Sequence, residues 1–108
     1  MTRRSRDPGP VLSALSDPTR REVLRSLSEA GPQTLSDLAA DLPVSRQAVA
    51  KHLALLEDAG LVESAGETRR RSYRITPEPL SNAMEWMVDV GATWDSRLGR
   101  LKRLLERR

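Results

Sequence analysis

The stretch "LPVSRQAVAKHLALLEDAGLV", residues 42 to 62, decides the fold of this 108-residue chain. Its apolar residues Val49, Leu53 and Leu56 recur at the spacing of one helix face. Ser45 stands where an N-cap belongs, and Gly60 stands where a helix commonly ends. The pattern therefore predicts a helix from residue 46 to about residue 59.

A second helix is expected immediately before this one. Thr34 and Asp37 form a capping pair at its start, close to the Thr-x-x-Glu pattern. Pro43 cannot continue the helix, and it also disfavours helical geometry in the residue before it. The two helices are then joined by four residues, "DLPV", which is the spacing of a helix-turn-helix.

The first turn of the helix from residue 46 lacks the acidic residues that a positive helix end favours. At about 3.6 residues per turn, its acid-free side lies opposite the apolar stripe. Gln47, Ala50, Lys51 and Ala54 lie on this side, and Arg46 is the first residue of the helix. Arg and Lys can bond guanine, Gln can bond adenine, and alanines permit close approach. We therefore expect DNA to supply the missing negative charge, with Arg46, Gln47, Ala50 and Lys51 reading bases.

An ordinary solvated helix face would be the default interpretation of an isolated helix of this kind, so the flanking elements matter. Residues 11–15 predict a short helix. Asp17 and Pro18 predict the cap and first position of the next one, which ends at Gly31 and Pro32. After Gly60, alternation in "LVES" and "RSYRIT" predicts two strands joined by an arginine-rich hairpin loop, with Tyr73 and Ile75 facing the core and Ser72 and Arg74 facing out.

The order of these elements predicts an α+β, mostly α fold: a winged helix-turn-helix with a two-stranded hairpin wing and a long C-terminal dimerisation helix. The expected organisation is a disordered basic arm at residues 1–9, a winged domain at 10–78 and a dimerisation helix at 79–108. Phosphate contacts are expected from the N-cap, the recognition helix and the wing, through Ser45, His52, Arg69, Arg70 and Arg71. For His52, packing and a hydrogen bond to backbone or phosphate are favoured over a pH switch.

The C-terminal helix carries an unbroken a/d seam of more than three heptads. Part of that seam needs another partner, because the helix is too long for so small a domain to cover. The expected dimer interface combines this seam with the first helix, through Leu12, Leu15, Leu80, Met84, Met87, Gly91, Trp94, Leu98 and Leu101. Trp86 and Trp94 leave open an effector pocket between subunits, although packing is the favoured interpretation.

Composition excludes several other classes of protein. There is no Cys and a single His, so disulfides, thiolate catalysis and a typical zinc site are excluded. No apolar run approaches a membrane helix, and the start "MTRRSRDPGP" has no apolar core of a secretory signal. A cytoplasmic protein without a cofactor is expected. No glycine-rich phosphate loop or catalytic triad motif is recognisable, so we do not expect an enzyme.

Residues 12 to 76 resemble the ArsR (arsenical-resistance repressor) family of bacterial winged-helix regulators. The closest features are "DPTRREVL", "VSRQAVAKHLALLEDAGLV" and "GETRRRSYRIT". The resemblance implies a dimeric DNA-binding repressor, and by motif position the family's base-contacting residues fall on Arg46, Gln47, Ala50 and Lys51. Many members sense metals through Cys pairs or through His and carboxylates, and this chain lacks such a set.

The sequence therefore predicts a homodimeric repressor that covers a promoter at a palindromic operator and does not respond to metals. Two recognition helices would enter major grooves about 34 Å apart. The alternative from another class is a winged-helix protein-interaction module without specific DNA binding, which would need no row of base-reading donors. An unidentified small-molecule effector and activation instead of repression both stay open.

Overall fold

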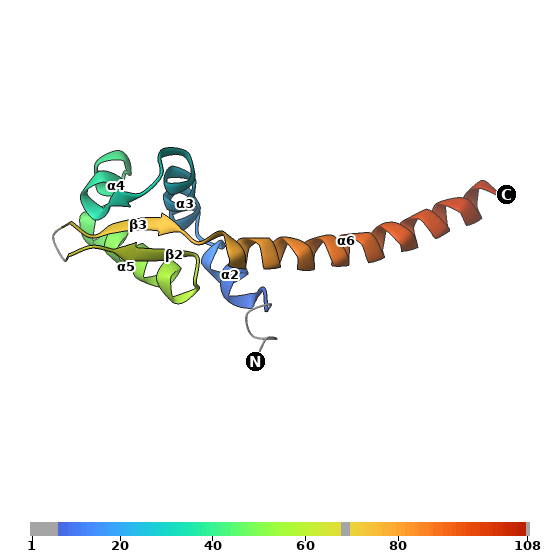
Figure 1. The fold of residues 1–108 in the computed structure, drawn as a ribbon. Helices are drawn as coiled ribbons and strands as arrows, with labels where there is room; N and C mark the ends of the chain where they lie inside the picture. The colour runs from blue at the N-terminus through green and yellow to red at the C-terminus, as the bar shows by residue number, and fades with distance from the viewer. Residues whose placement is uncertain (1–6, 68–69, 108) are drawn as a thin grey trace.

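A computed structural model describes residues 7–67 and 70–107 of the chain. It contains a small winged domain and one long helix that leaves it (Figure 1). The elements run in the order α2 (Gly9–Ala14), α3 (Pro18–Ala30), β1 (Gln33–Thr34), α4 (Leu35–Asp41), α5 (Arg46–Asp58), β2 (Val62–Ala65), β3 (Ser72–Ile75) and α6 (Pro77–Glu106). The basic arm expected at residues 1–9 falls largely outside the described residues.

The sheet has three antiparallel strands in the order β1-β3-β2. The predicted hairpin is present, with Val62 opposite Ile75 and Ala65 opposite Ser72. The sequence did not indicate β1, whose two residues pair Gln33 with Tyr73 and Thr34 with Ser72. Periodicity cannot reveal a strand of two residues, because alternation needs at least four positions to be recognised.

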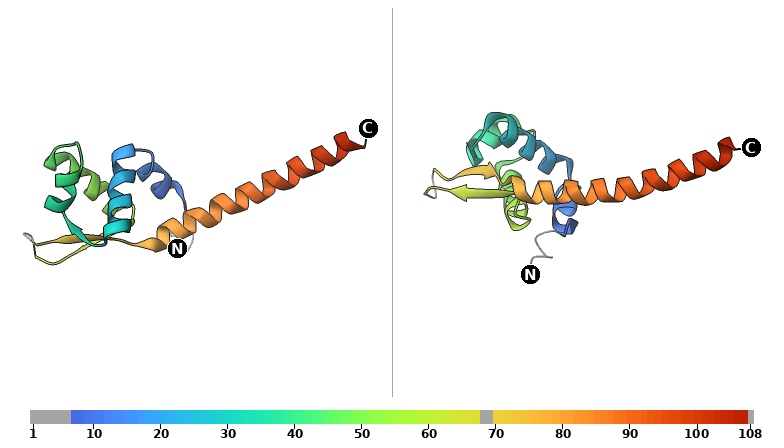
Figure 2. Two further views of the ribbon diagram at one scale, coloured as in Figure 1. Left: turned by 90° about the horizontal axis from the view of Figure 1, so that it is seen from above. Right: turned by 45° about the vertical axis from the view of Figure 1, so that its right-hand side comes forward.

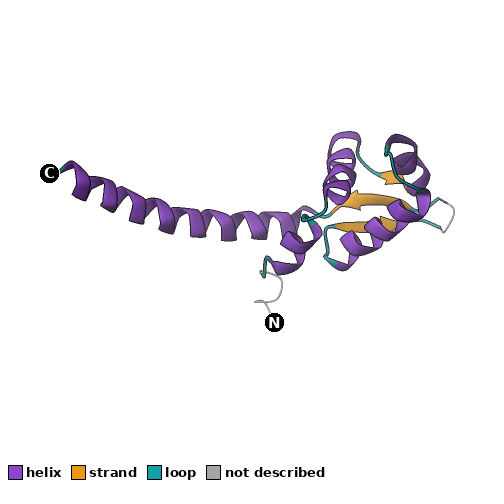
Figure 3. Cartoon of the chain, turned by 180° about the vertical axis from the view of Figure 1, so that it is seen from behind, coloured by secondary structure: helices purple, strands orange, loops and turns teal. Residues whose placement is uncertain are grey.

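A single core joins these elements. It is formed by the buried faces of α2, α3, α4, α5, the start of β2 and the start of α6 (seen from behind in Figure 3). The strands lie along one side of the helices, as the left view of Figure 2 shows. Its fully buried large side chains are Val23, Leu38, Val49, Leu53, Leu56 and Leu61. Tyr73 and Ile75 pack against it, as their alternation along the strand predicts, while Arg74 is exposed.

Helix α6 starts at Pro77, two residues before the expected boundary at Pro79. Both prolines fit in the first turn, where backbone N–H groups have no intrahelical partner to lose. Only the first turns of α6 pack on the domain: Ala83 is buried and Leu80 lies against the core. The remainder extends away as a single rod in every view, and the described chain measures 68 × 35 × 20 Å (Figure 2).

Candidate nucleic-acid interface

The junction between α4 and α5 is built by local capping. Thr34 and Asp37 form a complete capping box at the start of α4, with both reciprocal bonds at 3.1 Å. Leu42 ends α4 in extended geometry, as expected of the residue before Pro43. At the start of α5, the Ser45 side chain accepts a hydrogen bond of 3.1 Å from the backbone N–H of Ala48. The predicted helix-turn-helix is therefore present.

Helix α5 separates a core face from a solvent face. Val49, Leu53 and Leu56 are at most 1% exposed, which fixes the helix to the domain. As far as residue 56 the exposed side contains no acid, and Glu57 and Asp58 follow only in the last turn; its exposed residues include Arg46, Gln47, Ala50, Lys51 and Ala54. We call these five residues the recognition face. It brings together all four residues expected to read bases.

The chemistry of the recognition face suits an anionic, hydrogen-bonding partner. Arg46 offers a planar fork of donors and Lys51 a point charge one turn later, while Gln47 can both donate and accept. Ala50 and Ala54 have small side chains, so a partner can approach this part of the helix closely. The first turn also presents backbone N–H groups beyond the one that Ser45 caps, at the positive end of the helix.

The hairpin wing carries further positive charge. Gly66 makes the turn at its tip with φ 100°, and a Cβ there would lie 3.0 Å from the carbonyl oxygen of Arg70, so the turn requires glycine. Arg70 and Arg71 are exposed, and neither has an ion-pair partner among the described residues. Arg69, also expected to contact phosphate, lies outside the described residues.

Arg74 differs from the other wing arginines. Its guanidinium forms an ion pair with Glu63 across the two strands of the hairpin. The strand alternation correctly predicted that Arg74 faces out, but it gave no hint of this partner. An arginine already neutralised by a carboxylate is less available to an anionic partner than Arg70 and Arg71, which have no ion pair among the described residues.

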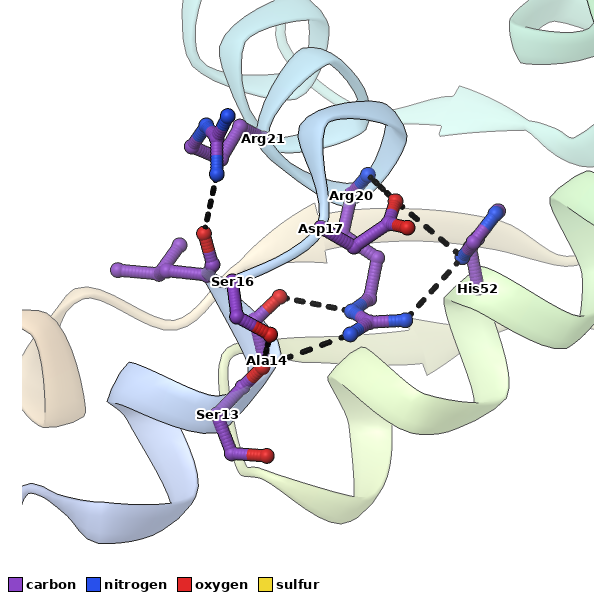
Figure 4. Close-up of polar contacts among 8 residues, drawn as sticks. Ser13, Ala14, Ser16, Asp17, Arg20, Arg21 and His52 are labelled. Atoms are coloured by element: carbon purple, nitrogen blue, oxygen red, sulfur yellow. Dashed lines mark hydrogen bonds and ion pairs between the residues drawn. The ribbon is translucent and has the colours of Figure 1, made fainter.

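A polar cluster that the sequence did not reveal holds the back of α5. Nη1 of Arg20 lies 3.4 Å from Nδ1 of His52, and its Nε donates to the carbonyl oxygen of Ala14 at 2.7 Å (Figure 4). Asp17, the N-cap of α3, places Oδ2 at 4.0 Å from the same His52 nitrogen. The cluster thus ties the end of α2 and the start of α3 to the recognition helix.

The charge on Asp17 is stabilised by this setting. Its carboxylate accepts the backbone N–H of Arg20 at 3.0 Å, which is the main cause that lowers the pKa of Asp17 below its ordinary value of 3.8. His52 and the Arg20 side chain add to the effect. The Nδ1 side of His52 therefore faces the domain, in agreement with the packing role expected for this residue.

The predicted dimer residues are largely uncovered in the single chain. Leu80 and Leu15 lie partly buried against the core, and Leu12 is at the border of exposure. The others are bare: Trp94 is 55% exposed, Leu98 is 57% exposed, and Met84, Met87, Gly91 and Leu101 are likewise exposed. We call the eight positions Leu80, Met84, Met87, Gly91, Trp94, Leu98, Leu101 and Leu105 the α6 seam.

Two further observations concern other kinds of site. Within residues 7–67 and 70–107, no group of three or more His, Cys, Asp or Glu side chains is placed to hold a metal ion. None of the described helices is long and apolar enough to cross a membrane.

Comparison with known proteins places these features among regulators. A family model described as a helix-turn-helix domain matches residues 15–65. The HTH-type transcriptional regulator YuzN of Bacillus subtilis is 41% identical over 85 residues, covering 73% of this chain and 92% of that protein. The transcriptional repressor SdpR of the same organism is 29% identical over 79 residues, covering 73% of this chain and 87% of that protein. An ArsR-like transcriptional regulator from Rhodococcus sp. RHA1 is 43% identical with a TM-score of 0.78, covering 90% of this chain and 91% of that chain.

Proposed function

Because this chain belongs to the ArsR family of helix-turn-helix transcriptional regulators, we propose that it is a homodimeric repressor that binds a palindromic operator and occludes a promoter. Its relatives are DNA-binding regulators, not enzymes. We also propose that its binding to DNA does not depend on metal ions. Because it acts on DNA, we place it in the cytoplasm.

The observation that carries the proposal is the recognition face of α5. None of its five exposed residues is acidic, and all but Ala54 stand in the first two turns of a helix whose other side is fixed to the core. A helix in the major groove presents this part of its surface to base edges. Arg46 and Lys51 would read guanine, Gln47 would read adenine, and Ala50 would contact a thymine methyl group.

The wing and the helix cap supply affinity without sequence preference. Arg70 and Arg71 lie next to the hairpin tip and would bind backbone phosphates, while Ser45 and His52 lie close enough to the recognition face to add contacts at its edge. Each phosphate contact releases counterions from DNA, so this part of the affinity falls as salt rises. Base contacts then select among sites that the phosphate contacts hold equally well.

The α6 seam supports the homodimer. Several consecutive heptad positions are apolar and exposed in the single chain, which is a larger stripe than a monomer usually presents to water. A twofold pair of chains would bind a twofold operator, with its half-sites a whole number of DNA turns apart. Occlusion then needs only that the operator overlap the promoter.

Independence from metals rests on the residues present. Soft metals are bound by thiolates and imidazoles, and this chain has no Cys and only His52, which faces Asp17 and Arg20. A small-molecule effector that is not a metal stays compatible with this proposal.

The alternative function is a winged helix that binds another protein. It explains the α6 seam but not an acid-free row of donors over the α5 start. Selection from a random DNA pool separates the two: we expect one enriched palindrome, bound in the presence of excess random DNA. A pool that shows no enrichment, with binding abolished by that competitor, would contradict the proposed function.

A further inference from the structure

A groove opens on the winged domain where α6 leaves it (Figure 1). It has a volume of about 300 Å³, which is the lower end of the range of small-molecule sites. Its apolar lining comes from four elements: Leu15 follows α2, Leu24 lies on α3, Ile75 ends β3, and Leu80 lies in α6. Leu24 is 7% exposed, and the other three pack against the core, so the fold fixes the position of this lining.

The polar residues of the groove carry only positive charge. Arg21, Arg25 and Ser28 line it at the spacing of one face of α3, and the described lining residues include no acid. The guanidinium of Arg21 is anchored, because its Nη1 donates a hydrogen bond of 2.7 Å to the carbonyl oxygen of Leu15. A guanidinium has five N–H donors, so Arg21 keeps donors for a further partner.

Arg25 is only loosely paired with an acid of its own helix. Its Nε lies 3.8 Å from Oε1 of Glu22, which is too long for a hydrogen bond, and the two side chains are 67% and 56% exposed. An exposed pair of this kind contributes little free energy in water. A ligand carboxylate that accepts two parallel N–H bonds from the guanidinium would be a stronger partner than Glu22.

An apolar lining beside two arginines fits an amphipathic anion. A hydrocarbon chain would cover the leucines and Ile75 and release the water that they contact, while a carboxylate at its end would bind the arginines. A neutral apolar molecule would leave the arginines without a ligand, and the arginines would repel a cation. The charge of the groove therefore selects among apolar ligands.

We propose that this groove binds a medium-chain fatty carboxylate, and that the bound ligand lowers affinity for the operator. The proposal rests on the proposed function and adds the chemical class of an effector to it. Leu15 and Leu80 line the groove and are also expected dimer contacts. A chain inserted between α3 and Leu80 would shift the start of α6, and with it the placement of the two recognition helices that the operator spacing requires. The ligand would thus bind the free dimer more tightly than the operator complex.

Calorimetric titration of the full-length protein with octanoate tests the groove, at concentrations below micelle formation. We expect one site per chain. 1-Octanol has a chain of the same length without the charge, so it should bind at least about tenfold more weakly. Arg25→Gln should weaken octanoate binding by roughly the same factor. Lys102→Gln, which removes an exposed cation of α6 outside the groove, is the matched control and should bind octanoate like the wild type.

The response of operator binding tests the effector role. Octanoate should lower the operator affinity of the wild type by roughly tenfold, and it should have a much smaller effect on Arg25→Gln at the same concentration. Anisotropy titrations with labelled operator, with octanoate or 1-octanol, measure both. Loss of operator affinity to the same extent with either compound would indicate a nonspecific action of the chain and overturn the effector role.

The other outcomes separate the groove from the proposed function. Octanoate that does not bind, or that binds Arg25→Gln as tightly as the wild type, would overturn the site. Binding to Leu98→Glu alone, if that variant is monomeric, would show that a second copy covers the groove in the dimer, which would also overturn it. Octanoate bound at the groove without any change in operator affinity would overturn the effector role. A chain that selects no operator would contradict the proposed function, while calorimetry would still decide whether the groove binds the carboxylate.

Discussion

Nδ1 of His52 lies 4.0 Å from Oδ2 of Asp17, so a residue of the recognition helix faces the carboxylate that caps α3. The Arg20 guanidinium approaches the same His52 nitrogen and also bonds to α2 (Figure 4). The orientation of α5 is therefore coupled to the segment that leads from α2 to α3, on the side of the domain from which α6 departs.

Asp17→Asn should reduce stability near neutral pH and have no effect in strong acid. Because the folded-state pKa of Asp17 is lowered, its charge adds stability above the unfolded value of 3.8, and this stability is lost as pH falls through the folded pKa. Asparagine keeps an N-cap oxygen but cannot ionise. Urea unfolding from about pH 6 to about pH 2.5 should show that the difference in free energy of unfolding between the wild type and the variant decreases toward zero. A constant difference over this range would contradict the coupling.

Arg46→Ala and Gln47→Ala should relax base preference more than they weaken overall binding. Each lost bidentate base contact should cost about 1–3 kcal/mol of discrimination between the operator and a mutated site. Titrations with operator, single-base variants and random DNA measure this. Equal weakening on all three kinds of DNA would show that the recognition face contacts only the backbone.

Arg70→Ala should weaken binding to all sequences about equally and reduce the slope of log affinity against log salt by about one contact. Arg74→Ala is the matched control, since Arg74 lies on the same hairpin but is paired with Glu63. Its slope should stay close to that of the wild type. If the two variants behave alike, the ion pair does not decide which wing arginines bind phosphate.

Zinc, cadmium and arsenite at micromolar concentration should leave operator affinity unchanged, because the chain has no Cys and one His. Fluorescence anisotropy with labelled operator, with and without a chelator, is the measurement. A stoichiometric zinc site accompanied by a tenfold change in affinity would contradict it, and acids of α6 such as Glu85 and Asp89 would then be examined first.

Leu98→Glu should produce a folded monomer with poor specific binding. Leu98 is 57% exposed in the single chain. A charge there should therefore change the stability of the folded monomer little and should strongly destabilise the dimer. Ser96→Glu, also exposed but outside the seam, is the control and should stay dimeric. A chain ending at Glu85, which keeps the core contacts of Leu80 and Ala83, should behave like Leu98→Glu. A monomer that binds the operator at full strength would show that dimerisation is not needed.

Local chemistry explains what the sequence predicted. Ser45, Thr34 and Asp37 act within three residues of their partners, so the caps and the helix-turn-helix were visible as patterns. The contact of Asp17 with His52 joins positions far apart in the chain, and no periodicity encodes it. The same holds for the pairing of Glu63 with Arg74, which depends on the register of the hairpin. The sequence predicted the exposed recognition face, while the structure was needed to show which flanking groups are already occupied.

The length of α6 sets a limit on the DNA itself. Thirty residues of helix measure about 45 Å, and α5 lies beyond the start of α6, away from its free end (Figure 1). If two copies overlapped in opposite directions along the whole of α6, the recognition helices would therefore be farther apart than the single turn of about 34 Å expected from the sequence. The next spacing that keeps both on one side of the duplex is about two turns. The base pairs midway would then touch no recognition helix, and their sequence would act only through the twist and stiffness of the DNA.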